Sequence, residues 1–444
     1  MLPSPEQLSK MIADVLADKE RQGHDISGMN ERLEAAGTSY DALMAVARYA
    51  AGLPLRKDWP YHEPNDLAGI LDAADTQRPT KPLAEPDAAA IAPRIEAAFL
   101  GSVCGCILGK PLEVNPTLAE IRAAAEPLGE WPLRDYVSSA MLDALGRRHN
   151  SWPATTSGNI RYAASDDDIN YTVTGMLVQE RKGYAFTMDD LADIWQSNLP
   201  INWTWGPERL FNIKNGIRSY FGWNLPRAFE EWVSLLQPGD ELCGAVIRAD
   251  AYGYSCPGNP ALAAELAWRD AAMTHRRTGI YATMYVAAAI ATAMACDDPL
   301  EVFRIAQQFV PQRSRFFAIV SDSLEHVRAA ADWLDGYNRI HGKYGQYGHC
   351  QVYQETGTLI NTLCFARDVG DGICMQVAQG NDTDSFGATA GSLLGAFFGP
   401  GHLDDRWLAP FNDTIHLGMA DEHEQSLSRL AKRMGRLPAV ARRR

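Results

Sequence analysis

The chain has 444 residues, of which 46% are apolar and 22% charged, and its formal net charge at pH 7 is −14. This composition is typical of a globular protein that is long enough for one large core or two domains. The negative charge argues against general nucleic-acid binding and against binding to anionic membrane surfaces. It leaves room for a local site that binds a small anion.

Three features bear on the compartment. No signal peptide is visible, because Met1 leads directly into a polar helical pattern. The longest uncharged stretch, from Thr278 to Cys296, predicts a buried core helix rather than a membrane span. The eight cysteines are scattered without paired metal-binding spacing, so we expect reduced, mostly buried thiols in a cytoplasmic protein.

Helical periodicity dominates the chain and predicts an all-α fold. Residues 4–53 predict two or three short amphipathic helices, broken at Gly23, Gly28 and Gly37, and a proline-rich connector follows them. We expect this helical N-terminal extension to pack on the body or to assist oligomerisation, although the oligomeric state itself is not indicated.

The predicted organisation has three parts. The N-terminal extension with its connector covers residues 1–92, and the main domain covers residues 93–428. Residues 429–444 are basic, and we interpret them as a frayed, solvated tail rather than a partner-binding arm.

The main domain begins with a glycine-rich segment, residues 101–113. Its Gly109-Lys110 pair invites comparison with a phosphate-binding loop, but Cys104 stands where the first glycine is needed and Pro111 where Ser or Thr is needed. The segment instead predicts a tightly packed helix that ends near Gly109. Glu113 then projects from the following loop.

A first acidic cluster, Ser165-Asp166-Asp167-Asp168, precedes an apolar helical run. Carboxylates that lie close together disfavour one another's ionisation unless a cation neutralises them. Three consecutive aspartates cannot all cap one helix, so at least one of them must face solvent or a cation.

A second cluster, Asn381-Asp382-Thr383-Asp384-Ser385, precedes a run of small residues that would allow close helix packing. Alone, it could be a helix N-cap. It also supplies hard oxygen ligands on one turn, as Mg²⁺, Mn²⁺ or Ca²⁺ requires. An EF-hand is excluded, because Phe386 and Leu393 occupy positions that need oxygen ligands. Taken together, the two clusters predict one metal site assembled by the fold.

Five tryptophans lie within residues 195–232, namely Trp195, Trp203, Trp205, Trp223 and Trp232. Most are expected in the core. Trp203 or Trp205, in a loop flanked by proline and asparagine, is the expected exception, because an exposed ring can stack on a nucleobase.

These segments, in this order, resemble the ADP-ribosylglycohydrolase family, which includes the enzymes that reactivate nitrogenase reductase. The similar segments are residues 101–113, 166–170, 244–248 with 264–275, and 380–396, and the resemblance spans roughly residues 95–400. It implies a compact, orthogonal multi-helix all-α fold with a centre of two Mg²⁺ ions, or of Mn²⁺.

The resemblance also implies site residues. Asp167 and Asp168 match the paired aspartate ligands, although a one-residue slip would make Ser165-Asp166-Asp167 the ligand triplet. The full set of implied metal ligands is Glu113, Asp166, Asp167, Asp168, Asp382, Asp384 and Ser385. His275 matches a histidine beside the substrate ribose, with a satisfied histidine at a helix end as the alternative. The other expected substrate-binding residues are Gly244, Asn381 and Trp205.

The chemistry agrees with this resemblance. Cleavage of a ribosyl linkage passes through an oxocarbenium-like state, and divalent cations can hold the ribose diol and lower the pKa of a bound water. Glu113 or Asp384 could accept the proton of that water, and the residues leave this choice open.

Two departures from the family pattern bear on the substrate. Cys106 stands where relatives usually carry Asp, and the segment 239–244 reads Gly-Asp-Glu-Leu-Cys-Gly in place of an Asn-Gly pair that receives a diphosphate. Two acids and a leucine are poor hosts for phosphate. We therefore expect a ribosyl hydrolase acting on a small molecule or an ADP-ribosylated protein, with a nucleoside N-ribohydrolase or a non-catalytic ligand-binding relative as alternatives.

Overall fold

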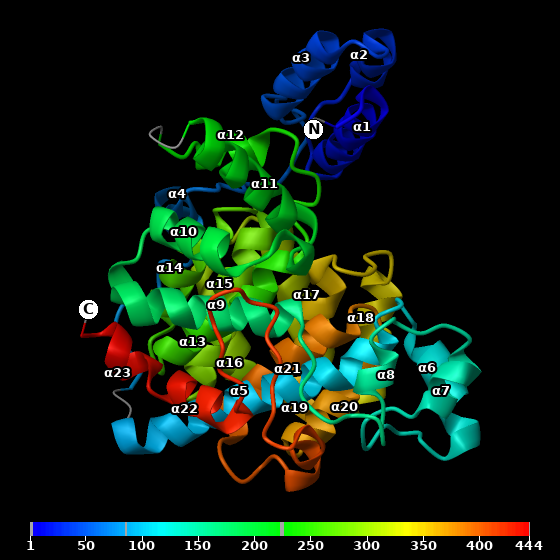
Figure 1. The fold of residues 1–444 in the computed structure, drawn as a ribbon, viewed down its shortest axis with the longest axis vertical. Coiled ribbons are helices and arrows are strands. Elements are labelled where there is room, and N and C mark those ends of the chain that lie inside the picture. Colours follow the sequence, from blue (N-terminus) through cyan, green and yellow to red (C-terminus); the bar gives the residue numbers. More distant parts are fainter. Residues whose placement is uncertain (1–2, 85–86, 223–225, 444) are drawn as a thin grey trace.

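The computed structural model describes residues 3–84, 87–222 and 226–443, and it is all-α (Figure 1). Within these ranges, β pairing is limited to isolated bridges. The α-helices are α1 Pro5–Arg21, α2 Met29–Ala36, α3 Tyr40–Ala51, α4 Leu67–Ala73, α5 Ala88–Gly109, α6 Leu118–Ala125, α7 Ser139–Leu145, α8 Trp152–Thr155, α9 Asp167–Lys182, α10 Met188–Asn198, α11 Gly206–Phe221, α12 Phe229–Ser234, α13 Asp250–Ser255, α14 Pro260–Ala271, α15 Thr278–Ala293, α16 Pro299–Ala306, α17 Arg315–Arg328, α18 Trp333–Tyr344, α19 Val352–Phe365, α20 Val369–Ala378, α21 Thr383–Phe398, α22 Leu427–Gly435 and α23 Leu437–Ala441.

Short 3₁₀ helices join several of these elements. They are η1 Lys110–Leu112, η2 Glu126–Leu128, η3 Gly183–Ala185, η4 Ile201–Trp203, η5 Cys243–Arg248, η6 Gln307–Phe309, η7 Asp405–Trp407 and η8 Ala409–Phe411.

The N-terminal helices α1, α2 and α3 project from one end of the body in Figure 1. Ser4 forms a capping box with Gln7 at the start of α1, and the three helices share a small apolar cluster of their own, with Leu8, Ile12 and Leu43 at its centre. The prediction of short helices between residues 4 and 53 is confirmed.

At the centre of the body, α5 crosses α21 with almost no side chain between the two backbones. A Cβ atom on Gly105 would lie 2.0 Å from the carbonyl oxygen of Gly387, and one on Gly101 would lie 2.5 Å from that of Gly391. The glycines are therefore required by this close approach, as the run of small residues predicted. The predicted helix end at Gly109 is also confirmed.

Helix α15 is wholly buried, which confirms the core helix predicted after Thr278. By length and hydropathy alone, residues 89–112 could span a membrane, but 72% of the most apolar part of this helix is buried inside the protein. Such burial is typical of a core helix.

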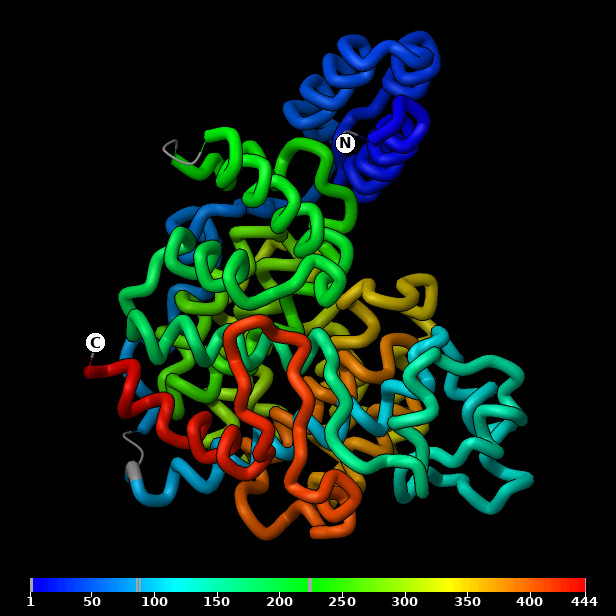
Figure 2. The backbone as a smooth tube through the Cα atoms, in the orientation of Figure 1, coloured from blue at the N-terminus to red at the C-terminus, as the bar shows by residue number. Residues whose placement is uncertain are grey.

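The C-terminal segment corrects the prediction of a frayed tail. It forms α22 and α23, and α22 packs along α5, as the red trace beside the start of that helix shows in Figure 2. Leu430 and Met434 are buried, and Arg433 forms ion pairs with Glu180 and Glu422. The basic residues therefore lie on the outer face of an amphipathic helix whose apolar face joins the core.

The tryptophans of residues 195–232 divide largely as expected. Trp195 is fully buried and Trp232 is half-buried, whereas Trp203 and Trp205 are 38% and 55% exposed. Trp223 lies outside the described residues.

Candidate active site

The two acidic clusters and the loop after α5 meet around one cavity of about 750 Å³. The predicted site residues that line it are Glu113, Asp166, Asp167, Asp382, Asp384, Ser385, Gly244 and Trp205. The lining residues that sequence reasoning did not assign to the site include Lys110, His149, Glu208, Cys243, His349 and Cys350. The fold thus joins the two clusters, as predicted.

The crossing of α5 and α21 sets this geometry. A Cβ atom on Gly109 would lie 2.1 Å from the carbonyl oxygen of Thr383, and the Thr383 hydroxyl donates to the carbonyl of Gly109 at 2.9 Å. The end of α5 and the start of α21 are therefore held together, which brings Lys110 next to Asp384.

The Lys110 ammonium lies at the centre of the carboxylates. Its Nζ is 2.7 Å from carboxylate oxygens of Glu113, Asp166 and Asp384, and its side chain is only 12% exposed. In the sequence, Lys110 stands out only as part of a segment that does not match a phosphate-binding loop. Its position directly ahead of Pro111 and Glu113 was the available signal.

Burial and mutual repulsion shape the pKa values here. Burial and the charge of Asp384 raise the pKa of Glu113 to about 9. Burial also opposes ionisation of Asp384, but Lys110 outweighs it and lowers the pKa of that carboxyl. Burial and the nearby Asp384 raise the pKa of Asp382 to about 6. Asp382 and Asp384 thus differ because Asp384 contacts the ammonium; Glu113 contacts it as well, but burial and the charge of Asp384 outweigh that contact.

The first cluster is arranged as its charge predicted. Asp166 is the N-cap of α9, where its carboxylate accepts the backbone N–H of Asp168 at 3.2 Å, and it also contacts Lys110. One aspartate therefore does face a cation, and that cation is a lysine. Ser165, Asp166 and Asp167 line the cavity, which is the one-residue slip left open above.

Asp168 lies behind the cavity wall and is 3% exposed. Neither of its carboxylate oxygens has a hydrogen-bond partner, and the same is true of Oδ1 of Asp384. Oxygen atoms of Asp166 and Asp168 also lie within 4.8 Å of one another and of the Cys106 sulfur. Unpartnered buried carboxylate oxygens are costly unless something positive is bound near them.

These residues fit a divalent cation only in part. The expected ligands are six carboxylates and a hydroxyl, and a single ammonium cannot neutralise all six in their ionised form, which is one reason why the pKa values of Glu113 and Asp382 are raised. However, Lys110 already fills the position between Glu113, Asp166 and Asp384. The cluster therefore suits one hard cation beside the lysine better than the pair of ions that the resemblance implies.

A thiol pair occupies the other side of the cavity. The thiols of Cys243, at the start of η5, and Cys350, in the loop before α19, both donate to Oδ2 of Asp382, with S···O distances of 3.1 and 3.3 Å. All eight cysteines are free thiols, and five of them are buried, which agrees with the expectation of mostly buried cysteines.

His275 is not brought to the cavity. Its side chain is fully buried, its Nδ1 lies 2.8 Å from the Thr274 hydroxyl, and Glu208 stands between it and the cavity with an oxygen 3.5 Å from Nδ1. Glu208 therefore lines the cavity where His275 was expected. Its carboxylate also accepts a hydrogen bond from the buried Arg248 at 2.6 Å.

Gly244 does line the cavity, directly beside the Glu208 carboxylate. A Cβ atom at this position would lie 2.6 Å from a Glu208 oxygen. Asn381 does not line the cavity, because its side-chain amide donates to Gln354 behind the start of α21.

The two acids of the 239–244 loop do not face the cavity, so the expected repulsion of a diphosphate is wrong. The Asp240 carboxylate accepts from Gln22, the C-cap of α1, at 2.6 Å, and Glu241 forms an ion pair with Arg315 at 2.6 Å. Asp18 accepts the backbone N–H of Gly239 at 2.8 Å. The N-terminal helices therefore hold this loop from outside.

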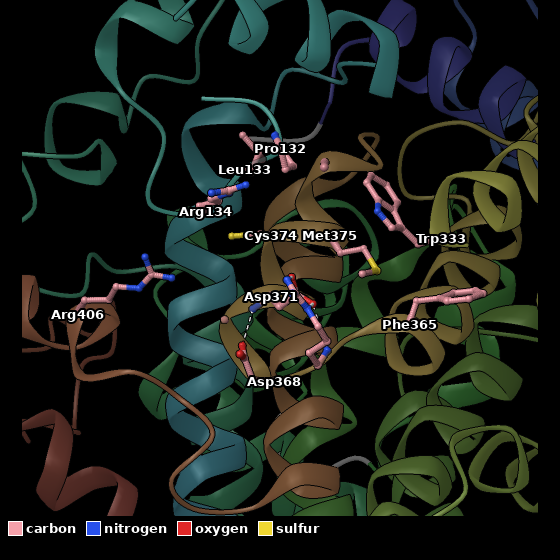
Figure 3. A pocket seen from close by; sticks show the side chains of 13 residues that line it. Pro132, Leu133, Arg134, Trp333, Phe365, Asp368, Asp371, Cys374, Met375 and Arg406 are labelled. Atoms are coloured by element: carbon pink, nitrogen blue, oxygen red, sulfur yellow. Dashed lines mark hydrogen bonds and ion pairs between the residues drawn. The ribbon is translucent and has the colours of Figure 1, made fainter. Parts of the chain in front are cut away.

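A second cavity, of about 560 Å³, lies against α20 and the segment around Pro132 (Figure 3). Its charged residues are surface arginines and the aspartates of the α20 N-terminus. Asp368 accepts the backbone N–H of Asp371, whose carboxylate pairs with Arg367 at 2.7 Å. These acids are satisfied by caps and ion pairs, unlike those of the first cavity.

Comparisons with known proteins identify the family of this chain. A family model described as ADP-ribosylglycohydrolase matches residues 87–442. The chain belongs to the ADP-ribosylglycohydrolase family. No curated protein matches it.

A solved structure titled "ADP-ribosylglycohydrolase-related protein complex" has a similar fold, with a TM-score of 0.51 and 19% sequence identity over 79% of this chain and 99% of that chain. At this identity the likeness concerns the fold, and it confirms the all-α ADP-ribosylglycohydrolase architecture. The family match extends through α22 and α23, which the sequence resemblance had left out.

Proposed function

We propose that this protein is a metal-assisted hydrolase of ribosyl linkages, with an ADP-ribosyl compound as its substrate. The observation that carries the proposal is the convergence of Glu113, Asp166, Asp167, Asp382 and Asp384 on one cavity that also holds exposed aromatic rings. A cavity of about 750 Å³ is large enough to enclose most of a nucleotide-sized ligand.

Asp167, Asp384 and Ser385, with Asp168 behind them, would hold a Mg²⁺ or Mn²⁺ ion through hard oxygens. Such an ion supplies a grip on the ribose diol and acidifies a bound water. Lys110 supplies the positive charge that a second ion would bring in relatives. We therefore propose one ion in this chain.

The chain's own residues would bind the base of the substrate and transfer the protons. Trp205, with the Arg209 guanidinium 4.6 Å from its ring centre, and Trp203 offer flat faces on which a base can stack at the rim. Asp384 and Glu113, two of the three carboxylates that contact Lys110, would accept the proton of the attacking water and return one to the leaving group.

The deciding experiment is a substrate panel assayed with Mg²⁺ and with Mn²⁺. It compares ADP-ribosyl-arginine, ADP-ribosyl-serine, ADP-ribosyl-threonine and free nucleosides, with the Asp384→Asn variant as the inactive control. We expect release of ADP-ribose from at least one conjugate, and its loss in the variant. Cleavage of free nucleosides without release of ADP-ribose from any conjugate would contradict this proposal and favour a nucleoside N-ribohydrolase.

One observation favours a nucleoside N-ribohydrolase as the second candidate. Among the described residues that line the cavity, Lys110 is the only Lys or Arg, and three carboxylates already engage it. A substrate without a diphosphate would need no further cation. The same panel separates the two candidates, because only the first releases ADP-ribose.

A further inference from the structure

The side of the cavity that holds the thiols of Cys243 and Cys350 contains a second group of side chains that could bind a metal ion. Cys243, Cys350 and Asp382 come from three segments that lie far apart in the chain. Their two sulfurs and a carboxylate oxygen all lie within 4.8 Å of one another. Both thiols point at the same oxygen, Oδ2 of Asp382.

The donor types select a class of ion. Mg²⁺ takes oxygen ligands, whereas thiolate sulfur selects softer ions, of which Zn²⁺ is the common one and accepts Cys, His and carboxylate together. The cysteines of this cavity would therefore discriminate against the hard cation that the carboxylate side suits. Cys243 is buried and Cys350 is half-buried, and thiols in such places need no partner beyond apolar surroundings, so their joint approach to one carboxylate is the feature to explain.

Neighbouring groups extend the set. A ring nitrogen of His349 lies within 4.8 Å of a carboxylate oxygen of Asp382, and Nδ1 of this ring is buried without a hydrogen-bond partner. Glu355 is 2% exposed; its Oε1 accepts the backbone N–H of Asp382 at 2.9 Å, and its Oε2 has no partner. Glu355 is placed to support the ligand segment from behind, as outer residues of metal sites do.

We propose that Cys243, Cys350 and Asp382 bind a Zn²⁺ ion, with His349 as the fourth ligand. Binding releases the two thiol protons to solvent, and each sulfur then coordinates the ion as a thiolate. The ion can enter from solvent because Cys243, His349, Cys350 and Asp382 all line the cavity. This inference shares Asp382 with the carboxylates of the proposed function, but it is carried by the thiols of Cys243 and Cys350, which the proposed hydrolysis does not use.

The test uses the purified full-length protein, kept reduced and stripped of metal. Co²⁺ is added as a spectroscopic substitute for Zn²⁺, because thiolate coordination produces an intense charge-transfer absorption that oxygen ligands do not. We expect this absorption to saturate at one Co²⁺ per chain and to disappear when Zn²⁺ displaces the cobalt. In Cys243→Ser and in Cys350→Ser, we expect Zn²⁺ affinity to fall by at least about 10²-fold, more than the loss of an outer-shell residue causes.

Two control variants sharpen the result. Cys296→Ser alters a cysteine that does not line the cavity and should keep the absorption. Asp384→Asn should also keep it while losing hydrolysis, so the thiol site and the proposed activity can fail separately. Circular dichroism verifies that each variant is folded.

Three results would overturn the site. They are Co²⁺ binding without thiolate absorption, absorption that persists in both cysteine variants, and no metal binding by reduced protein that instead forms a Cys243–Cys350 disulfide on oxidation.

Discussion

The two sides of the acidic cavity solve the same electrostatic problem differently. On one side, the Lys110 ammonium joins Glu113, Asp166 and Asp384 at 2.7 Å each. On the other, the hydrogen-bond donors that the described residues offer to Oδ2 of Asp382 are the thiols of Cys243 and Cys350. A thiol is a weak donor that carries no charge, so it cannot replace a cation.

The consequence is visible in two carboxylates that are separated by one residue. Lys110 overcomes burial and lowers the pKa of Asp384, whereas burial and the charge of Asp384 raise the pKa of Asp382 to about 6. The carboxylate side is therefore balanced in part by the chain itself, and the thiol side depends on what binds there.

The largest effect is expected from Asp384→Asn, which removes a charge that contacts Lys110 and lines the cavity. We expect hydrolysis to fall about 10³-fold, as for loss of a group that handles protons or holds the ion. Rates are measured at saturating Mg²⁺. Asp371→Asn, in the second cavity, is the matched control and should keep most of the activity. Equal losses in both variants would contradict the assignment of the site.

Lys110→Met tests whether the ammonium acts as a built-in cation. Without it, three carboxylates face one another in a buried site, and we expect the metal-free protein to lose about 3 kcal/mol of stability. Thermal unfolding with a chelator and with Mg²⁺ measures this loss.

In the Lys110→Met variant, the vacated position can accept a divalent ion, so Mg²⁺ should recover more stability than it adds to the wild-type protein. The matched control is Lys343→Met, because Lys343 forms an exposed ion pair with Asp322 whose removal should cost under about 1 kcal/mol. If Mg²⁺ stabilises both proteins equally, Lys110 does not stand in for an ion.

Asp250 shows what a buried carboxyl does with no cation at all. It is 2% exposed, its oxygen accepts from the hydroxyls of Ser102 and Ser392, and burial raises its pKa to about 7. Between about pH 4 and pH 7, the folded protein keeps a proton that the unfolded chain releases, so stability falls as the pH rises.

Asp250→Asn removes this titration. We expect the variant and the wild-type protein to be similarly stable at pH 5, and the variant to be more stable by about 2 kcal/mol at pH 8. Denaturant unfolding at several pH values measures the difference. A difference that does not grow with pH would show that Asp250 does not titrate in this range.

Part of this site could be read from the sequence. Asp166, Asp382 and Asp384 stand out because acids beside an apolar helical run are unusual, and helix periodicity with small residues predicted the close packing of α5 and α21. The fold class followed from the same periodicity.

The parts of the site that could not be predicted from the sequence depend on the directions in which side chains point. Cys243 and Cys350 are lone cysteines in the sequence, and only the fold places them beside Asp382. His275 does not reach the cavity because Glu208, which belongs to no recognised motif, lies between them. The prediction of a solvated tail in place of α22 and α23 was wrong because the many basic residues outnumber the few apolar residues of α22 that pack on α5.

The smallest effect on hydrolysis is expected from Cys243→Ser. The serine hydroxyl can still donate to Asp382, and the carboxylates that contact Lys110 are untouched, so activity at saturating Mg²⁺ should change by less than about 3-fold, or ~0.7 kcal/mol. The assay is run with and without a zinc-selective chelator, which should not affect the variant. If the variant loses as much activity as Asp384→Asn, the two sides of the cavity act as one centre, and the division between a carboxylate side and a thiol side would be wrong.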